Sequence, residues 1–436
     1  MSSKSSSAAS NMTLPLFPHE PVVTPQLRAV SRKDHLTFKA NREHGRHGWL
    51  RLTPAYSVHI VEDLLVRYGR DDIVLDPFCG SGTTALVCAQ AGMACDTIDI
   101  NPFLVWLTNA KCAAYTGDDI STADLVLCSA LSGVAESFAV DAPATWIPPI
   151  KDVEKWWEHN TLCLLAEIFT RLRHVDVSAP ARDLLTVIFC RVAIELASVS
   201  FGHQSMSFKK PGPTPVLLET PRYEHVRAAF DRAKDGVFRS ARVALHEGTA
   251  QAMLGDSRRV ESVVRDRRYS VVITSPPYPN RMSYIRELRP YMYWLGYLTN
   301  GRQAGELDWQ AIGGTWGCAT SNLMAWTPPE SRPIPYGTFD EVVERITGRS
   351  KVLGIYVRKY FCDMVEHIHS VRAVLSAGAT VHYVIGNSKF YDVMLHTEQI
   401  YAAILRDAGF QDVTVEMVRK RTSKKELFEY IVSARA

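Results

Sequence analysis

The amino-acid sequence predicts an α/β fold whose centre is a parallel, doubly wound sheet. Residues 73–100 alternate as strand, tight turn, helix and strand, which is the βαβ unit from which such sheets are built. The same alternation returns at AMLGDSRRV and YSVVITSPPY (252–260 and 269–278). The chain then ends on two alternating strands, VTVEMV and LFEYIV, joined by the basic turn RKRTSKK, which indicates a closing antiparallel hairpin.

Each element follows from the hydrophobic pattern and its breaks. The predicted helices cover residues 58–68, 84–91, 224–246, 360–375 and 398–408, and the predicted inner strands cover 73–75, 95–100, 270–274 and 379–387. Residues 123–197 are helical in character, 209–221 form a Pro-rich connector, and 279–355 form a long segment with four of the nine tryptophans. Because no internal repeat is visible and the α/β pattern resumes after each interruption, we interpret the chain as one domain with two insertions.

Composition limits the class of protein. The 436 residues are 46% hydrophobic and 22% charged with a net charge of +3, so they can build a core, and any nucleic-acid binding depends on local basic patches. The nine cysteines lie singly, without a CxxC pair, which argues against a zinc ribbon and fits a reducing cytosol. No apolar run of about 18 residues suggests a membrane span, and no signal peptide is recognisable. We therefore expect a cytoplasmic protein that does not engage a membrane.

The turn DPFCGSGTT follows a predicted strand and opens a predicted helix, which is the context of a ligand-binding loop. Gly80 and Gly82 let the backbone approach a ligand, and the helix N-terminus presents free N–H groups to an anion. That anion is a pyrophosphate in a dinucleotide site and the methionine carboxylate in a site for S-adenosylmethionine (SAM). Asp99 ends the next strand, where a carboxylate accepts both ribose hydroxyls. Together these features predict nucleoside binding; the alternative is a structural turn, and a Walker-type loop is disfavoured because no GK[ST] follows.

A second turn, Ser275-Pro276-Pro277-Tyr278, follows the buried strand VVIT. Its two prolines fix φ and stiffen the turn. A stiff turn holds a side-chain oxygen and a carbonyl where they accept both hydrogens of an exocyclic amine and pull its nitrogen toward a tetrahedral, nucleophilic shape. The tyrosine offers a stacking face to a base that has left its duplex. Catalysis then depends on positioning the nitrogen in line with a methyl donor; the alternative is a plain surface turn.

At this point the motifs carry a resemblance. DPFCGSGTT closely resembles motif I of the DNA amino-methyltransferases, HGWLRLTPAYS resembles the segment before that motif, and LGDSR resembles the segment whose acidic residue holds the adenine amino group. The resemblance implies SAM as cofactor, no metal, and a Rossmann-like SAM-dependent methyltransferase fold. That fold has a mostly parallel seven-stranded sheet with an antiparallel C-terminal hairpin, here with helical and Trp-rich insertions. It assigns the cofactor to Thr53, Asp76, Pro77, Phe78, Gly80, Gly82, Thr83, Thr84, Asp99, Asn101 and Asp256.

By the same resemblance, Ser275, Pro276, Pro277 and Tyr278 are the catalytic residues. The first residue of this motif is Asp, Asn or Ser in the family, and Ser is most associated with enzymes that act on cytosine N4. We therefore expect a site-specific DNA methyltransferase that flips its target out of double-stranded DNA and methylates cytosine N4. Adenine N6 remains an alternative, and guanine N2 in tRNA a weaker one. A silent SAM- or DNA-binding protein is disfavoured because both motifs are intact.

Further residues near these motifs are candidates for contacts with DNA. We expect Arg281, Arg286 and Arg289 to contact phosphates, and Tyr284, Tyr291 and Tyr293 to line the base pocket. The alternative for this run is a plain amphipathic helix with solvated arginines. The resemblance puts Gly386 and Asn387 at the mouth of that pocket. Basic clusters suited to phosphates comprise Arg32, Lys33, Lys39, Arg42, Arg46, Lys209, Lys210, Arg419, Lys420, Arg421, Lys424 and Lys425; the alternative for each is a solvated surface.

The organisation that follows has six parts. They are a disordered tail (1–30), the SAM-binding half of the catalytic domain (31–115), a helical insertion (116–250), the catalytic segment (251–295), a Trp-rich insertion (296–352) and the C-terminal part of the catalytic sheet (353–436). Sequence recognition must reside in an insertion, and the Trp-rich one is slightly favoured. We expect a restriction or phage-defence protein as partner, in the cytoplasm of a bacterium or archaeon.

Overall fold

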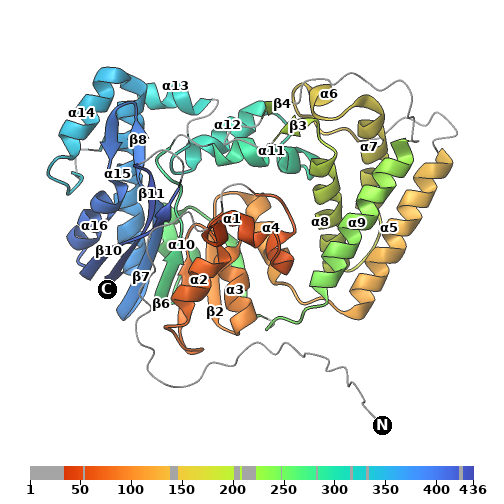
Figure 1. Cartoon of the computed structure of the whole chain (residues 1–436), viewed down its shortest axis with the longest axis horizontal. Coiled ribbons are helices and arrows are strands. Elements are labelled where there is room, and N and C mark those ends of the chain that lie inside the picture. Colours follow the sequence, from red (N-terminus) through yellow and green to blue (C-terminus); the bar gives the residue numbers. More distant parts are fainter. Residues whose placement is uncertain are drawn as a thin grey trace, which may run out of the picture.

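The computed structural model of this chain describes residues 34–52, 55–137, 146–200, 207–208, 222–246, 248–280, 283–314, 318–329, 333–421 and 426–436. It has a central sheet flanked by helices, with a group of long helices standing beside it (Figure 1). The predicted tail at 1–30, the predicted cofactor residue Thr53 and the predicted connector at 209–221 lie outside the described residues.

A seven-stranded sheet forms the centre of the molecule. In pairing order its strands are β10 (Gln411–Lys420), β11 (Phe428–Arg435), β7 (Leu375–Gly386), β6 (Tyr269–Thr274), β1 (Ile73–Asp76), β2 (Ala94–Asp99) and β5 (Ala250–Leu254). The strands from β7 to β5 are parallel, whereas β11 pairs antiparallel with both β7 and β10. The predicted Rossmann-like sheet with a C-terminal hairpin is therefore confirmed. Its order reverses between β1 and β6, and ligands bind at the carboxyl ends of strands beside such a switch point.

Helices cover both faces of this sheet. One face packs on α2 (Val58–Leu65) and α3 (Thr83–Ala91), and the other on α10 (Val260–Val264), α15 (Lys351–Ala373) and α16 (Thr397–Asp407). Within the strands, Val74 and Val271 belong to the first core, whereas Leu75 and Val272 belong to the second. Successive side chains point to opposite faces of a strand, so this alternation yields a three-layer α/β/α sandwich.

The helices that follow β1 and β2 have well-defined ends. Helix α3 ends at Gly92, whose φ of +71° is the left-handed conformation typical of a helix C-terminus. Helix α4 (Pro102–Cys112) begins with a proline in its first turn, and the side chain of Asn101 accepts a hydrogen bond from the N–H of Phe103. Because α3 and α4 begin directly after the turns that follow β1 and β2, the first turns of both helices lie at the carboxyl edge of the sheet.

The first insertion is a bundle of helices between α4 and β5. Its members are α5 (Gly117–Ser137), α6 (Val153–Trp156), α7 (His159–Arg173), α8 (Ala179–Glu195) and α9 (Arg222–Ala241), which Figure 1 shows at the side of the sheet. They share a core with the catalytic segment, because Trp294 packs edge-on against Trp157, Phe169 and Phe189 at ring distances of 5.0–5.6 Å. The helical character predicted for this region is confirmed.

The second insertion is also helical. It contains α12 (Gly301–Gln310), α13 (Cys318–Ala325) and α14 (Phe339–Arg349), for which the sequence predicted no fixed elements. It follows α11 (Tyr284–Trp294), a helix that the sequence indicated only as an alternative. Helix α11 continues through Pro290, and α12 begins at Gly301. These residues usually interrupt helices, so they obscured the periodic pattern.

Short elements complete the fold. They are η1 (Asp34–Leu36), α1 (Phe38–Asn41), η2 (Gly45–Gly48) and η3 (Ser257–Arg259), with the pairs β3 (Val199–Ser200) and β4 (Ser207–Phe208), and β8 (Ser388–Phe390) and β9 (Val393–Leu395). No helix in the described part of the chain is long and apolar enough to cross a bilayer.

Candidate active site

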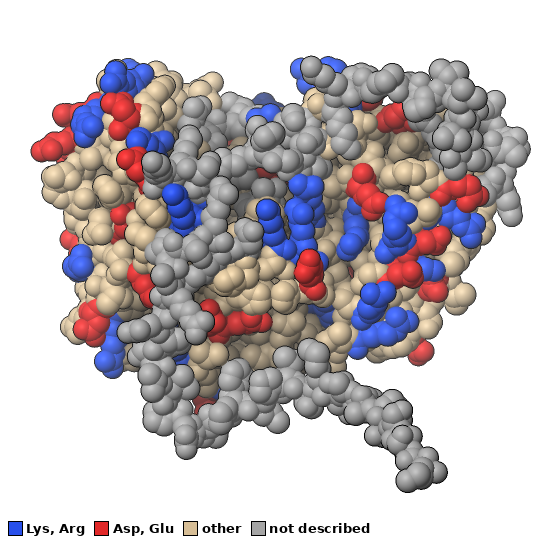
Figure 2. All heavy atoms as spheres, in the orientation of Figure 1, with Lys and Arg blue, Asp and Glu red and all other residues tan. Residues whose placement is uncertain are grey.

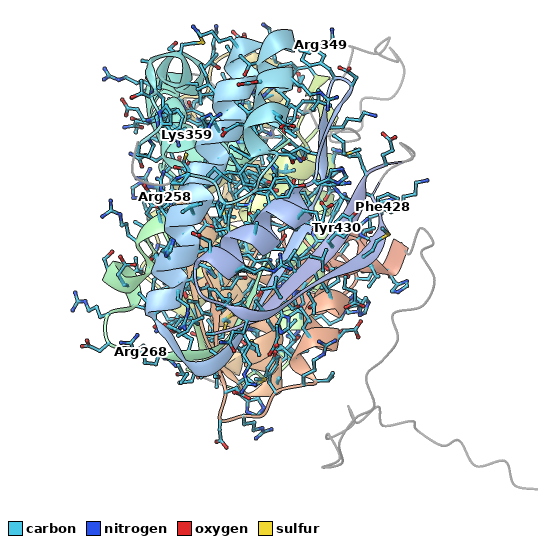
Figure 3. The ribbon with its side chains drawn as sticks, turned by 90° about the vertical axis from the view of Figure 1, so that its left-hand side faces the viewer. Arg258, Arg268, Arg349, Lys359, Phe428 and Tyr430 are labelled. Carbon is cyan, nitrogen blue, oxygen red and sulfur yellow. The ribbon has the colours of Figure 1, made fainter. Side chains whose placement is uncertain are left out.

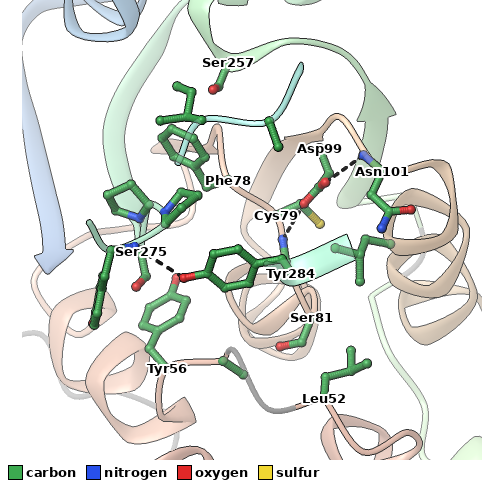
Figure 4. A pocket seen from close by; sticks show the side chains of 18 of the residues that line it. Leu52, Tyr56, Phe78, Cys79, Ser81, Asp99, Asn101, Ser257, Ser275 and Tyr284 are labelled. Carbon is green, nitrogen blue, oxygen red and sulfur yellow. Dashed lines mark hydrogen bonds between the residues drawn. The ribbon is translucent and has the colours of Figure 1, made fainter. Parts of the chain in front are cut away.

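A cavity of about 610 Å³ opens at the carboxyl ends of β1, β2 and β6. Its lining includes ten of the predicted site residues: Pro77, Phe78, Gly80, Asp99, Asn101, Asp256, Ser275, Pro276, Pro277 and Tyr278. In Figure 4, Phe78 and Ser275 lie on one side and Asp99 and Asn101 on the other. The structure thus brings the predicted cofactor turn and the predicted catalytic turn into one cavity of the size that small-molecule sites have.

The glycine turn is shaped by its backbone. Gly80 and Gly82 have φ angles of +52° and +74°, in the left-handed region that favours glycine. A Cβ on Gly82 would lie 2.5 Å from Oγ1 of Thr108, because α4 packs directly against the turn. Gly80 therefore forms part of the cavity wall, whereas Gly82 lets the turn rest on α4 behind that wall.

Asp76 is buried behind the cavity. Its Oδ1 accepts hydrogen bonds from Oγ1 of Thr274 (2.6 Å) and the N–H of Phe78 (3.1 Å), and its Oδ2 accepts one from Oγ1 of Thr84 (2.6 Å). Burial raises the pKa of Asp76 to about 7, against the opposing effect of these hydrogen bonds. Asp76 thus joins the ends of β1 and β6 to the start of α3. Thr83 is buried beside it and shares a hydrogen bond with Ser81 (3.0 Å).

Asp99 lies in the opposite wall. Its Oδ2 accepts a hydrogen bond from the N–H of Gly80 (2.9 Å) and its Oδ1 one from the N–H of Asn101 (2.8 Å). Burial raises the pKa of Asp99 to about 6, and the backbone hydrogen bonds oppose that rise. Asp99 is thus oriented by backbone donors, and a carboxylate, with about four lone-pair positions, retains acceptor capacity toward a ligand hydroxyl.

Asp256 follows β5 and is held by an arginine. Arg258 donates to both of its carboxylate oxygens at 2.7–3.1 Å and also donates to Asp363 (3.2 Å) and the carbonyl of Gln310 (2.8 Å). Burial raises the pKa of Asp256, but the contacts with Arg258 outweigh it and hold the pKa below its usual value. Figure 3 shows Arg258 and Lys359 along the same flank, where Lys359 binds Asp363 at 2.6 Å. Asp256 is therefore linked to the second insertion.

A buried histidine supports the ring of Phe78. The two ring centroids lie 4.7 Å apart, Nδ1 of His367 donates to the carbonyl of Ser257 (2.7 Å), and Nε2 accepts from the hydroxyl of Tyr383 (3.1 Å). Burial lowers the pKa of His367 to about 4, so the ring is neutral at pH 7. Sequence reasoning missed this residue because its contacts come from distant parts of the chain.

The turn after β6 is fixed from three elements. Oγ of Ser275 donates to the carbonyl of Val384 in β7 (3.0 Å), and the hydroxyl of Tyr360 in α15 donates to the carbonyl of Pro277 (2.7 Å). The N–H of Tyr278 donates to the hydroxyl of Tyr284 in α11 (3.3 Å). Because the one hydroxyl proton of Ser275 is engaged, its oxygen is available as an acceptor.

Tyr278 lies among charged residues of the β10–β11 hairpin. Its hydroxyl donates to Oε1 of Glu429 (2.9 Å), and Arg419 binds both oxygens of Glu429 (2.7 and 3.1 Å). The guanidinium carbon of Arg421 lies 4.6 Å from the centroid of the tyrosine ring. Gly386 makes room for both, since a Cβ there would lie 2.2 Å from Nη1 of Arg421 and 2.9 Å from Cε2 of Tyr278. The sequence had indicated these arginines only as phosphate contacts and had not indicated Glu429.

Lys111 is a further residue that the sequence did not indicate. It is buried beneath the glycine turn, where its Nζ donates to the carbonyl of Ser81 at 2.8 Å. Burial lowers the pKa of Lys111 to about 8. A lysine in the last turn of a helix is normally exposed, so only the apolar residues around it could have suggested its position.

Arg46 is not a phosphate contact, and that prediction is wrong. It is only 3% exposed, and its guanidinium donates to the carbonyls of Lys111, Ala113, Ser240, Ala241 and Val243. These carbonyls lie at the C-terminal ends of α4 and α9, where the helix dipole favours a cation. Arg46 therefore clamps the cofactor-side half of the sheet to the helical insertion.

The other predicted residues divide between the cavity and the core. Tyr284 lines the cavity, whereas Tyr291 stacks on Phe103 (5.2 Å) and Arg289 packs over Trp156 (5.1 Å) in the core of the helical insertion. Asn387 joins β7 to the hairpin, because its side chain accepts from the N–H of Phe428 and donates to the carbonyl of Glu426, both at 2.9 Å. The amphipathic-helix alternative thus holds for most of α11.

Residues 58–110, which include the glycine turn and Asp99, match the family model described as DNA methylase of the N6/N4 type. Over this segment the chain is similar to the DNA amino-methyltransferases. The family and its fold imply SAM as methyl donor, and the cavity fits that molecule. Two carboxylates, Asp99 and Asp256, offer acceptors for hydroxyl and amino groups, and apolar side chains such as Phe78, Ile98 and Ile312 offer surface for a flat ring.

Two curated relatives match over short segments. The Type II methyltransferase M.BsoBI of Geobacillus stearothermophilus is 36% identical over 69 residues, 15% of this chain and 14% of that protein. The Type II methyltransferase M.AvaI of a Nostoc strain is 34% identical over 76 residues, 17% of this chain and 16% of that protein. The match thus spans less than a fifth of the length of either relative.

Among solved structures, the rRNA methyltransferase aviRa from Streptomyces viridochromogenes aligns over 88% of this chain and 86% of that chain, with 12% identity and a TM-score of 0.27. The fold assignment rests on the strand order of the sheet and not on this alignment.

Proposed function

We propose that this protein is a DNA methyltransferase that transfers the methyl group of SAM to the exocyclic N4 of cytosine. The observation that carries the proposal is that the Ser275 turn and the Asp99 wall face one cavity of about 610 Å³. A methyl donor held at one wall and an amine held at the other are then close enough for direct transfer, which positioning alone accelerates strongly.

The catalytic turn favours attack by a weak amine nucleophile. The hydroxyl of Ser275 donates a hydrogen bond to the carbonyl of Val384, so its oxygen presents lone pairs, and the tyrosine contact at Pro277 keeps the turn rigid. An oxygen of Ser275 and a neighbouring backbone carbonyl accept the two amine hydrogens and direct the nitrogen lone pair outward. No protein nucleophile takes part, since the amine itself forms the new bond and releases a proton.

The cofactor wall supports donor binding by its own residues. In this proposal Asp99 accepts the ribose hydroxyls, Asp256 accepts from the adenine amine, and Gly80 with Ser81 faces the methionine end. SAM supplies an electrophilic methyl group on a sulfonium centre. Asp76 acts from behind the wall, where its contacts with Thr274 and Thr84 hold the two turns in register. Thr83 contacts Ser81 within the glycine turn.

Double-stranded DNA is the proposed substrate, and the second insertion is its proposed reader. Gln310, Ala311 and Ile312 of this insertion line the cavity beside the catalytic turn. Basic side chains near the same opening, Lys39 on α1 and Lys420 on β10, line the cavity and suit phosphate contacts. Figure 2 shows Lys and Arg gathered near the middle of the face on which α1 lies. We also propose a restriction or phage-defence partner and a cytoplasmic location, from the family alone.

Nucleoside mass spectrometry tests the reaction. DNA from a host that expresses the protein should contain N4-methylcytosine, and Ser275→Ala should remove it. Ser376→Ala is a matched control, because Ser376 lies at the opposite end of β7 from the cavity, and it should leave the product unchanged. N6-methyladenine in place of N4-methylcytosine would correct the base, and a new modified nucleotide confined to tRNA would reject DNA as the substrate.

A further inference from the structure

We propose that Arg421 is a displaceable cover on the aromatic platform of Tyr278. In the free protein it occupies the place of the flipped base, and it leaves when a base enters. This inference rests on the proposed function. It adds that Arg421 of the β10–β11 hairpin and the flipped base compete for one face of the Tyr278 ring.

The platform itself is fixed. The hydroxyl of Tyr278 donates to Glu429, which is 3% exposed and is in turn held by both donors of Arg419. The main chain beside the ring is held at Pro277 by Tyr360. With its edge and its backbone both tied, the ring cannot turn aside to make room for a base.

The cover and an incoming base need the same space. The guanidinium carbon of Arg421 lies 4.6 Å from the ring centroid. Stacked aromatic rings have centroids about 4.5–7 Å apart, so no base fits between the guanidinium and the ring. A base that stacks on this face must displace Arg421.

The cover is held far more weakly than the platform. Its guanidinium donates to the carbonyl of Asn387 at 2.9 Å, and no ion pair of Arg421 occurs within the part of the chain that the structure describes. Arg419, two residues earlier, is locked instead in a bidentate ion pair with a buried carboxylate. The hairpin therefore provides one arginine that stays and one that can leave. Lys420 and Arg421 both line the cavity, so in this proposal the displaced Arg421 is free to contact a DNA phosphate.

A nucleoside carries no phosphate, so the effect of an Arg421 substitution on its binding reports the stacking site and not a phosphate contact. The test measures binding of 2′-deoxycytidine and 2′-deoxyadenosine by ligand-observed NMR, with S-adenosylhomocysteine present, for the wild type and for Arg421→Ala, Arg421→Lys and, as control, Arg435→Ala at the exposed end of β11. We expect Arg421→Ala to bind its preferred nucleoside about tenfold more tightly than the wild type, a change of about 1.4 kcal/mol. Arg421→Lys should be intermediate, because an ammonium covers less of the ring, and Arg435→Ala should match the wild type, because Arg435 does not line the cavity.

The opposite order overturns the proposal. Weaker nucleoside binding by Arg421→Ala would make the arginine a wall of the base site, and equal binding would mean that the guanidinium and the base use different space. Failure of every protein to bind either nucleoside, while all of them bind S-adenosylhomocysteine, would also reject the platform. If the wild type methylates no nucleic acid, the proposed function is wrong, and the nucleoside mass spectrometry described above tests this separately. Arg421→Lys keeps a cation at the hairpin and guards against a change due to misfolding.

Discussion

Asp76 and Asp99 look alike in the sequence, since each ends a buried strand beside the glycine turn. Their surroundings differ, because Asp76 accepts hydrogen bonds from Thr274, Thr84 and Phe78 behind the wall, whereas Asp99 accepts only from backbone donors and lines the cavity. One carboxylate is thus filled by the protein and the other is open to a ligand. The residue that decides this is Thr274, 198 positions from Asp76.

Asp99→Asn should weaken binding of S-adenosylhomocysteine by about 1–3 kcal/mol, the cost of poorly paired buried polar groups. The wild-type affinity should also rise between pH 5 and pH 7, because the pKa of Asp99 is raised only to about 6 and the ionised carboxylate is the better acceptor. Calorimetry over this range measures both effects. Asp76, with a pKa of about 7, titrates in both proteins, so the difference between the two profiles isolates Asp99. Identical profiles would remove Asp99 from the ribose site.

The inner elements of the fold are well predicted from sequence, and the reason is local. Strands β1 and β6 are short, mostly apolar runs bounded by turn residues, and the glycine and Pro-Pro turns carry their own geometry. Helices α12 to α14 were not predicted, and α11 only as an alternative, since Pro290 lies within α11 and Gly301 begins α12. The hairpin side of the site was missed because its contacts are distant in sequence: Tyr278 and Glu429 are 151 residues apart.

The link between β1 and β6 is testable through Thr274. Thr274→Val keeps the shape but removes a donor to the Asp76 carboxylate, so we expect a loss of about 1–3 kcal/mol in the free energy of unfolding. The pKa of Asp76 is raised to about 7 in the folded state, and losing a donor raises it further. The folded carboxylate is then harder to ionise, so the destabilisation should be larger at pH 8 than at pH 6. Urea unfolding at the two pH values measures this.

Thr274→Ser is the matched control for that experiment. It retains the hydroxyl donor to Asp76, so its unfolding should lack the extra loss at pH 8. A pH-independent loss shared by Val and Ser would point to packing and not to the hydrogen bond.

At the scale of the whole molecule, the helical insertion is continuous with the catalytic domain. One hydrophobic core contains Trp49, Phe103 of α4, Trp157 of the insertion and Trp294 of α11. Two independent modules would meet at a polar surface, whereas the residues between the helical insertion and the catalytic domain are apolar and buried. The six parts inferred from the sequence are therefore segments of the chain and not independent folding units. We propose that the helical insertion, α5 to α9, and the sheet fold together.

Trp294→Ala tests this continuity. Trp294 is 1% exposed and packs edge-on against three aromatic rings. Its truncation should cost about 3–5 kcal/mol in the free energy of unfolding while keeping a single transition. Urea unfolding followed by both far-UV circular dichroism and S-adenosylhomocysteine binding checks this. Two separate transitions, with cofactor binding retained after the first, would show that the insertion is an independent module.

The contacts of Arg46 tolerate substitution of the residues that accept its hydrogen bonds but not of Arg46 itself. All five of its acceptors are main-chain carbonyls, so the contact does not depend on which side chains stand at the ends of α4 and α9. Lysine cannot replace the arginine, because a single ammonium cannot reach five carbonyls arranged around a planar fork. Substitutions at the ends of α4 and α9 therefore leave this joint intact, whereas the joint depends on the identity of residue 46.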